Sequence, residues 1–143
     1  MLTGGYYYTD EMTVDAGLRV FNTWMGDPGK VILLGKVIET INKDKLLKNV
    51  QQTGEYLLEN IQKLQDKYSK LLKNTRGIGT FCAVDAKDVV TMQKIMELMR
   101  NKGVQMGSCG AHTIRFRPTL VFQKHHVDIV MKLFDEVLQD LAQ

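Results

Sequence analysis

The sequence has little that would cross-link, anchor or address a protein chain. Its two cysteines, Cys82 and Cys109, lie far apart and form no Cys-x-x-Cys pair. This argues against a disulfide framework and fits a reducing compartment. No run of apolar side chains exceeds four residues, as in 31–34, whereas a membrane-spanning helix needs about 18. We therefore expect a soluble intracellular protein that has no membrane partner.

Neither sign of charge is in large excess. The chain has 19 Lys and Arg against 16 Asp and Glu, a net charge of +3, which is too small an excess for a dedicated polyanion binder. The lysines between 43 and 73 alternate with apolar residues, as on a solvated helix face, so we predict no nucleic-acid partner. The three histidines lack a spacing that places two imidazoles on one helix face, and we predict no metal site.

What is present fits one domain-sized chain: 143 residues, of which 44% are hydrophobic. The pair Asp27-Pro28 predicts a helix start, because Asp is a preferred N-cap and Pro suits the first helical position. A second, long helix is predicted from about Asp44 to Leu71. Gly54 lies in its apolar stripe, where a neighbouring backbone is expected to come close.

Beyond Asn74 the hydrophobic period changes between strand-like and helical. It predicts, in order, a strand at 79–85, a helix from Val89 closed by Gly103, short strands at 104–106 and 113–117 around a turn at 107–110, and a helix at 127–141. The segment 76–79 is interpreted as a helix stop and turn. The fold class is therefore α/β, with a small lobe of β-α-β-β-α order.

We expect three parts: an extended arm at 1–26, a helical connector at 27–74 and the small α/β lobe at 75–143. In the arm, Gly4-Gly5 followed by Tyr6 to Tyr8 predicts a turn that runs into a strand. An isolated strand cannot satisfy its backbone groups. Its pairing partner is therefore expected upstream of Met1, in a longer protein.

Two segments are candidate sites. In 113–117, strand alternation places Ile114 and Phe116 on one face and Arg115 and Arg117 on the other. The arginines are either solvated or form a planar clamp for a carboxylate. The loop 21–28 precedes a helix N-terminus, which either attracts a phosphate or is capped by its own polar side chains. Spacing alone leaves both choices open.

Several segments together resemble one enzyme family. They are Met1–Gly5, Val20–Pro28, Arg76–Cys82, Arg100–Val104, Gly107–Gly110 and Ile114–Phe122. In order and spacing they are similar to the C-terminal part of the eukaryotic 4-aminobutyrate (GABA) aminotransferases. These belong to the class III, fold type I, pyridoxal-phosphate-dependent aminotransferases. The resemblance runs along nearly the whole chain.

The resemblance implies a homodimeric mitochondrial matrix enzyme that converts GABA and 2-oxoglutarate into succinate semialdehyde and glutamate. The family's Schiff-base lysine would stand just upstream of Met1, so this chain carries no catalytic residue. We expect it to bind no cofactor and to be inactive by itself. Neither Cys82 nor Cys109 matches the cysteines that hold an iron–sulfur cluster in some members.

Two positions match family motifs. Thr23 matches the threonine that reaches the cofactor phosphate of the other subunit. Arg115 matches the arginine that pairs with a glutamate while GABA is bound and then accepts the α-carboxylate of 2-oxoglutarate or glutamate. An alternative is a freestanding small-ligand or interaction module with Arg115 as its carboxylate anchor. The arm and the loop at 21–28 favour the aminotransferase, because a freestanding module has no use for them.

Overall fold

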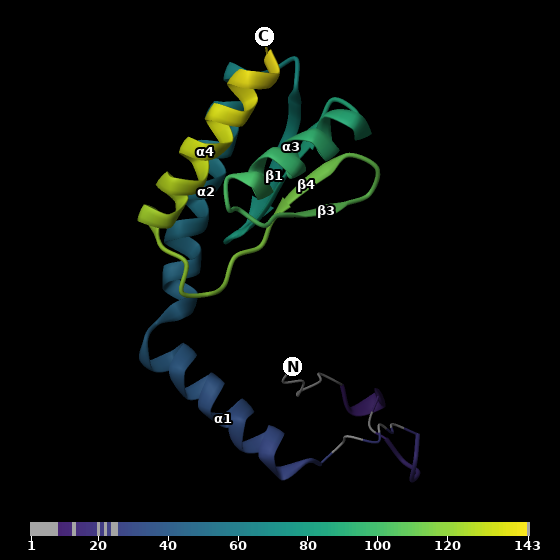
Figure 1. Cartoon of the computed structure of the whole chain (residues 1–143). Helices are drawn as coiled ribbons and strands as arrows, with labels where there is room; N and C mark the ends of the chain where they lie inside the picture. The colour runs from purple at the N-terminus through teal and green to yellow at the C-terminus, as the bar shows by residue number, and fades with distance from the viewer. Residues whose placement is uncertain (1–8, 13, 20, 22, 24–25, 143) are drawn as a thin grey trace. The chain divides into compact units, whose positions relative to one another are not determined.

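The computed structural model describes residues 9–12, 14–19, 21, 23 and 26–142, which form two compact units, 1–45 and 46–143 (Figure 1). The strand predicted at Tyr6 to Tyr8 lies outside the described residues. The predicted division into an arm, a connector and a small lobe, with boundaries at 26 and 74, stays a prediction.

The first unit contains a 3-10 turn at Asp10–Met12 and the helix α1 at Pro28–Lys43. The predicted start of α1 is confirmed: the side chain of Asp27 accepts a hydrogen bond from the backbone N–H of Lys30 at 3.2 Å. None of the residues of α1 is buried.

The second unit consists of two packed layers, a four-stranded sheet and three helices. In chain order its elements are α2 (Leu46–Lys67), β1 (Leu72–Ile78), β2 (Phe81–Ala86), α3 (Val89–Asn101), β3 (Gly107–Cys109), β4 (Thr113–Phe116) and α4 (Lys124–Ala142). All strand pairs are antiparallel, in the order β1-β2-β4-β3. The predicted α/β class is confirmed, and the predicted β-α-β-β-α order follows a strand that was not predicted.

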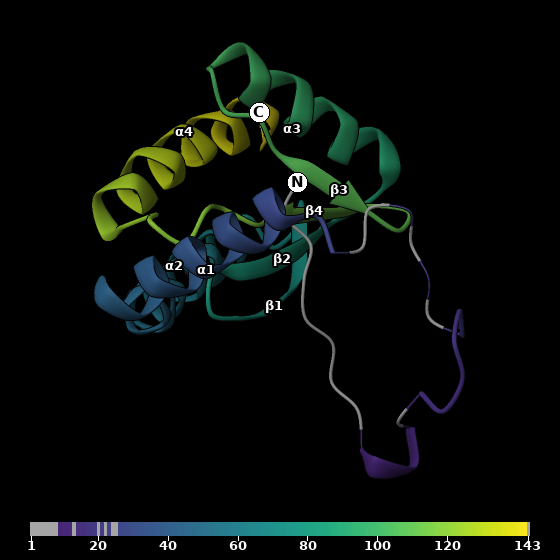
Figure 2. The ribbon, with the colours of Figure 1, turned by 90° about the horizontal axis from the view of Figure 1, so that it is seen from below.

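The core lies between the helices and one face of the sheet. Helix α2 packs on β1 and β2, α3 packs on β2 and β4, and α4 packs on α2 and α3; Figure 2 shows α3 and α4 together. Val84 and Ile114 point into this core from the two central strands, and Phe134 meets them from α4; all three are fully buried. Phe134 also makes an edge-to-face contact with Phe116, with ring centroids 5.8 Å apart.

The structure corrects three predictions. Residues 76–78, interpreted as part of a turn, belong to β1, and the preceding helix ends at Lys67 rather than Leu71. The strand escapes prediction because it is an edge strand whose register is interrupted between Lys73 and Arg76, so its exposed residues do not alternate. Strand β3 occupies 107–109, which was predicted to be the turn, whereas residues 104–106, predicted to be a strand, form none.

The close approach predicted at Gly54 is confirmed. A Cβ atom added there would lie 2.1 Å from the carbonyl carbon of Gly79, in the turn between β1 and β2. Gly79 itself has a φ of 53°, in the left-handed region that favours glycine. Helix α2 and this turn therefore pack backbone against backbone.

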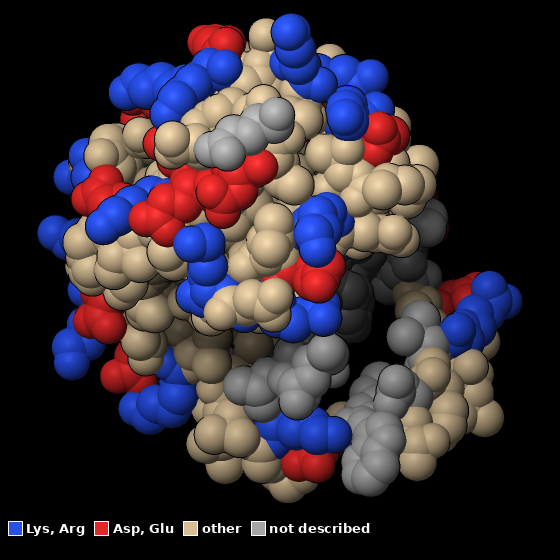
Figure 3. Space-filling view, turned by 45° about the horizontal axis from the view of Figure 1, so that its top comes forward, with Lys and Arg blue, Asp and Glu red and all other residues tan. Residues whose placement is uncertain are grey.

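The lysines predicted to form a solvated face, at 43, 45, 48, 63, 67, 70 and 73, are all exposed. On the face in Figure 3, Lys and Arg are interspersed with Asp and Glu. In the described part of the chain, no helix is both long and apolar enough to cross a membrane.

Candidate functional site

Arg115 lies in the central strand β4, on the sheet face opposite the core. Its strand neighbours Ile114 and Phe116 are buried, whereas Arg115 is half-buried. Ile114 and Phe116 therefore lie on one face of the strand and Arg115 on the other, as predicted. Across the sheet, Arg115 pairs with Ala83 of β2 on one side and with Gly107 of β3 on the other.

Both neighbours of Arg115 are small, and Gly107 is in direct contact with it. A Cβ atom added to Gly107 would lie 2.9 Å from Nη2 of Arg115 and 3.5 Å from its Cζ. The guanidinium therefore lies across the backbone of β3, in space that another side chain at 107 would fill. A side chain at 107 would displace this flexible guanidinium.

An open pocket of about 370 Å³ lies beside Arg115. It is lined by both Arg115 and Arg117, together with apolar side chains that include Phe122 and Val130. The loop after β4 is held by Asn49 of α2, whose side-chain amide donates to the carbonyls of Leu120 at 2.9 Å and Phe122 at 2.8 Å. Two guanidiniums beside an apolar wall can bind a small organic acid through its carboxylate.

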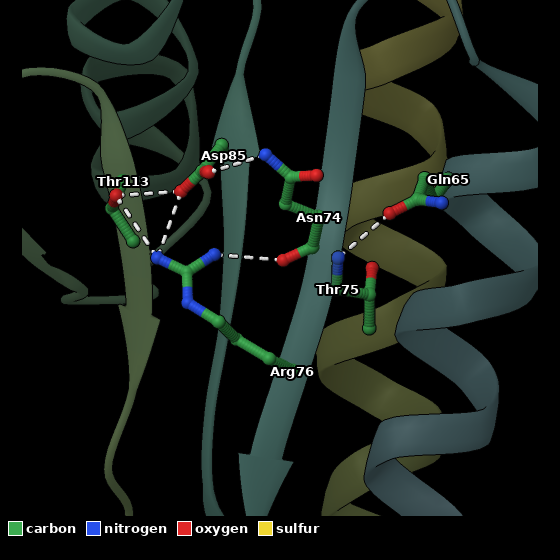
Figure 4. A network of polar contacts seen from close by, with 6 residues as sticks. All are labelled: Gln65, Asn74, Thr75, Arg76, Asp85 and Thr113. Carbon is green, nitrogen blue, oxygen red and sulfur yellow. Dashed lines mark hydrogen bonds and ion pairs between the residues drawn. The ribbon is translucent and has the colours of Figure 1, made fainter.

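A polar network lies on the same face of the sheet as Arg115 and joins β1, β2 and β4 (Figure 4). The carboxylate of Asp85 in β2 accepts a hydrogen bond from the hydroxyl of Thr113 at 2.6 Å and from Nη2 of Arg76 at 3.0 Å. Its other oxygen accepts from the side-chain amide of Asn74 at 3.1 Å. Three strands, β1, β2 and β4, are thus joined through one carboxylate.

Burial of Asp85 by itself raises the pKa of its carboxyl group. The hydrogen bonds from Thr113, Arg76 and Asn74, together with the positive charge of Arg76, outweigh burial and lower the pKa from 3.8 to about 2. Asp85 is therefore a carboxylate at any physiological pH.

Arg115 differs from Arg76 in its partners. Within the part of the chain that the structure describes, no carboxylate forms an ion pair with Arg115 and no hydrogen bond of its guanidinium is found. The group is thus half-buried, charged and open to an external acceptor. A carboxylate is the acceptor whose geometry matches a guanidinium best.

Thr23 lies in an exposed turn before α1. Of the two interpretations of the loop at 21–28, the capping one is supported at the helix itself, because Asp27 already accepts the N–H of Lys30. The carboxylate of Asp27 would also oppose a phosphate at this helix end. The exposed hydroxyl of Thr23 remains a suitable hydrogen-bond donor, and its role in cofactor binding stays a prediction.

The two cysteines are free thiols with different surroundings. Cys82 is buried in β2, and burial raises the pKa of its thiol to about 11. Its sulfur contacts the carbonyl oxygen of Gly79 at 3.4 Å. A thiol that stays protonated is a poor nucleophile, so Cys82 has a packing role.

Sequence reasoning found Arg115 but missed its neighbour Gly107 and the ion pair of Arg76 and Asp85. A signal for Asp85 exists in the sequence, because its carboxylate follows a buried strand residue, Val84, in a strand that also carries Ala86. That signal gains meaning only when β2 and β4 are known to pair with Asp85 opposite Thr113. Arg76 was assigned to a turn and so could not be placed on the face.

Comparisons with known proteins place the fold in its family. The class III aminotransferase family matches residues 1–138 of the chain. The chain therefore belongs to the class III aminotransferases.

Within this family, the chain is similar to 4-aminobutyrate aminotransferases. It is 43% identical to the mitochondrial 4-aminobutyrate aminotransferases of Sus scrofa and Homo sapiens over 140 residues, 98% of this chain and 28% of each relative. It is 38% identical to the 4-aminobutyrate aminotransferase of Schizosaccharomyces pombe over 94% of the chain and 29% of the relative. The chain thus spans a little over a quarter of the length of these relatives.

Solved structures share the fold at lower identity. The lysine aminotransferase of M. tuberculosis superposes with a TM-score of 0.76 at 21% identity, over 78% of this chain and 26% of that chain. The acetylornithine aminotransferase of Elizabethkingia anophelis superposes with a TM-score of 0.67 at 20% identity, over 71% of this chain and 27% of that chain. These likenesses establish the fold type I aminotransferase architecture for the matched region.

Proposed function

We propose that this chain is the C-terminal part of a 4-aminobutyrate aminotransferase, which transfers the amino group of GABA to 2-oxoglutarate and yields succinate semialdehyde and glutamate. The observation that carries the proposal is the 43% identity to the pig enzyme along 98% of the chain. The position of Arg115, beside a pocket and with no ion-pair partner in the described residues, gives it chemical support.

Arg115 binds the α-carboxylate of 2-oxoglutarate or glutamate in this proposal. Its planar guanidinium offers two parallel N–H donors to a carboxylate, and the small neighbours Ala83 and Gly107 leave it room to change position. The family glutamate with which it alternates would come from another part of the complete enzyme. Arg115 thus orients the acid substrate and does not itself move a proton.

The cofactor of the complete enzyme is pyridoxal 5'-phosphate, which supplies the electron sink for amino-group transfer when it is bound. The residue of this chain that would hold it is Thr23, whose exposed hydroxyl can donate a hydrogen bond to the phosphate. By the family motif, Thr23 serves the cofactor of the other subunit of a homodimer. The names of the mammalian relatives favour a mitochondrial location.

The role of Arg115 is tested by Arg115→Lys in the complete enzyme that contains this chain. Lysine keeps the charge but loses the two-pronged geometry, so the half-reaction with 2-oxoglutarate should slow by about ten- to a hundredfold in kcat/KM, whereas the half-reaction with GABA should change less. Arg100→Lys is the matched control, because Arg100 is exposed in the last turn of α3 and does not line this pocket. Equal losses in both half-reactions would remove Arg115 from this selective role.

The role of Thr23 is tested by mixing subunits. Thr23→Ala should weaken cofactor retention by about 1–2 kcal/mol, the usual scale for one hydrogen bond to a charged group, and Thr23→Ser should retain most of it. A subunit that lacks the upstream lysine but keeps Thr23 should restore retention to a Thr23→Ala partner. If verified heterodimers of these two subunits fail to complement, Thr23 does not act across the interface.

The proposal as a whole has a direct check. The coding sequence immediately upstream of Met1 should specify the family's lysine, and its product joined to this chain should show GABA:2-oxoglutarate aminotransferase activity. A coding sequence that encodes no such lysine would contradict the proposal.

A further inference from the structure

We propose that Arg76 is a positioning residue for Arg115: by occupying the carboxylate of Asp85, it prevents Asp85 from capturing Arg115 and so leaves Arg115 available to the substrate carboxylate. The inference rests on the proposed carboxylate-binding role of Arg115. It assigns a function to an ion pair that lies outside the motif in which Arg115 was recognised.

The sheet register places Asp85 and Arg115 on one face. Asp85 lies opposite Thr113 in the β2–β4 pair, and Arg115 is two residues further along β4, opposite Ala83. Asp85 and Arg115 are therefore diagonal neighbours on the face away from the core, at roughly 7–8 Å along the sheet. The guanidinium of Arg115 lies over Gly107 of β3, and its long side chain would reach Asp85 by turning back across β4. Among the four described strands, Asp85 is the sole acidic residue.

The carboxylate of Asp85 is already fully engaged. Arg76 donates to one oxygen at 3.0 Å, Thr113 donates to the same oxygen at 2.6 Å, and Asn74 donates to the other oxygen at 3.1 Å. Arg76 is itself fixed by a second hydrogen bond, from Nη1 to the carbonyl of Asn74 at 2.7 Å. The pair is thus neutral and leaves Asp85 little capacity for another cation.

The irregular backbone of β1 allows both Asn74 and Arg76 to reach Asp85. The register is interrupted between Lys73 and Arg76, and Asn74 has a φ of 57°, in the left-handed region. These features bring both the side-chain amide of Asn74 and the guanidinium of Arg76 to Asp85 (Figure 4). The backbone N–H of Thr75 donates a hydrogen bond to Oε1 of Gln65 in α2, at 2.8 Å.

Removal of Arg76 would leave the carboxylate of Asp85 with two neutral donors, Thr113 and Asn74. The nearest cations in the register are then Lys73, opposite Asp85 on β1, and Arg115, diagonal to it on β4. Lys73 is exposed to solvent, whereas Arg115 is half-buried, so the carboxylate attracts Arg115 more strongly. A substrate carboxylate would have to compete with Asp85. Its apparent affinity would fall in proportion to the fraction of Arg115 that stays free.

The experiment measures the affinity for 2-oxoglutarate in the isolated half-reaction of the complete, cofactor-loaded enzyme. Arg76→Gln should weaken this affinity roughly tenfold, as expected for one competing ion pair. Arg76→Lys should stay near the unmodified enzyme, because it keeps the charge. The decisive variant combines Arg76→Gln with Asp85→Asn: it removes both charges and should restore the affinity, although it also loses hydrogen bonds.

A purely structural role predicts the opposite ranking, because the double variant disrupts the network more than either single one. Affinity in the double variant that is no better than in Arg76→Gln would therefore overturn the inference. So would unchanged affinity in a folded Arg76→Gln enzyme. If Arg76→Gln does not fold, Ala83→Asp places a free carboxylate opposite Arg115, and it must weaken 2-oxoglutarate binding more than Ala83→Asn does.

Arg115→Gln separates the two proposals. If Arg115→Gln leaves 2-oxoglutarate affinity unchanged, the proposed function of Arg115 fails, and this inference fails with it. If Arg115→Gln weakens the affinity while the double variant shows no rescue, the inference about Arg76 alone is wrong.

Discussion

At the scale of single residues, a buried carboxylate is unfavourable unless hydrogen bonds and charge compensate it. Asp85 meets this condition with three donors from two other strands. The same contacts that lower its pKa also tie β1 and β4 to β2. Its protonation is therefore linked to the stability of the sheet.

This linkage predicts a pH dependence. Because the pKa of Asp85 falls from 3.8 to about 2 on folding, the carboxylate stabilises the folded state above about pH 4 and loses that contribution as the pH falls towards 2. The contribution is on the order of 2 kcal/mol. Urea unfolding at pH 6 and pH 2.5 should show a larger loss for the unmodified chain than for Asp85→Asn. Parallel losses in the two chains would contradict the linkage.

Thr75 offers the reverse case, a buried hydroxyl that costs stability. Its Oγ1 is buried and has no hydrogen-bond partner among the described residues. Thr75→Val keeps the shape and removes the unsatisfied oxygen, so we expect about 1 kcal/mol of added stability in urea unfolding.

Thr113→Val is the matched control for this substitution. The hydroxyl of Thr113 donates to Asp85 at 2.6 Å, so the same change should cost about 1–3 kcal/mol. Loss of stability in Thr75→Val of the same size as in Thr113→Val would show that the hydroxyl of Thr75 is satisfied.

At the scale of elements, the helices could be predicted well and the short strands poorly. Helix α1 has a cap at Asp27 that can be read directly, and α4 carries an apolar stripe that includes Val127 and Phe134. Such signals are local. Strand β3 has three residues and begins with Gly107, and it is placed by pairing with β4 rather than by a pattern of its own. No periodicity within three residues can reveal that.

The contact between α2 and the β1–β2 turn gives a prediction at this scale. Gly54→Ala would place a methyl group 2.1 Å from the carbonyl carbon of Gly79, so the backbones must separate. We expect a loss of about 1–3 kcal/mol, or a failure to fold, in thermal or urea unfolding.

Gly35→Ala in α1 is the control, because no heavy atom lies within 4 Å of the added methyl group. It should gain helicity by circular dichroism, since Ala is favoured over Gly by about 1 kcal/mol in a helix. Equal tolerance of alanine at both glycines would show that α2 and the turn do not pack closely.

At the scale of the whole molecule, the candidate site was predictable only in part. Arg115 and its face follow from alternation in one strand, whereas its relation to Asp85 depends on which strands pair and in what register. Arg76 needs, in addition, an interrupted strand that brings its side chain back to Asp85. Both depend on pairing between residues far apart in the sequence, which no local pattern along the chain can reveal.

The distribution of buried residues predicts which part of the chain folds independently. All the buried hydrophobic residues of the described chain lie between Leu57 and Leu138, within the unit 46–143. Helix α1 has no buried residue, and its side chains at Val31, Ile32 and Leu33 are more than half exposed. A 16-residue helix without tertiary packing is marginal in water.

We therefore expect a chain of residues 46–143 to fold with the same antiparallel sheet and with a Tm within roughly 2 °C of that of the whole chain, since a change of 1 kcal/mol would shift it by about 4–8 °C. Hydrogen exchange should in addition protect the amides around Ile61 of α2 far more than those of α1, because opening of buried helices requires disruption of the core. Differential scanning calorimetry of both chains checks the first expectation. A Tm lower by 4 °C or more in the shorter chain would show that residues 1–45 stabilise the core, and protection of α1 equal to that of α2 would show that α1 is packed in solution.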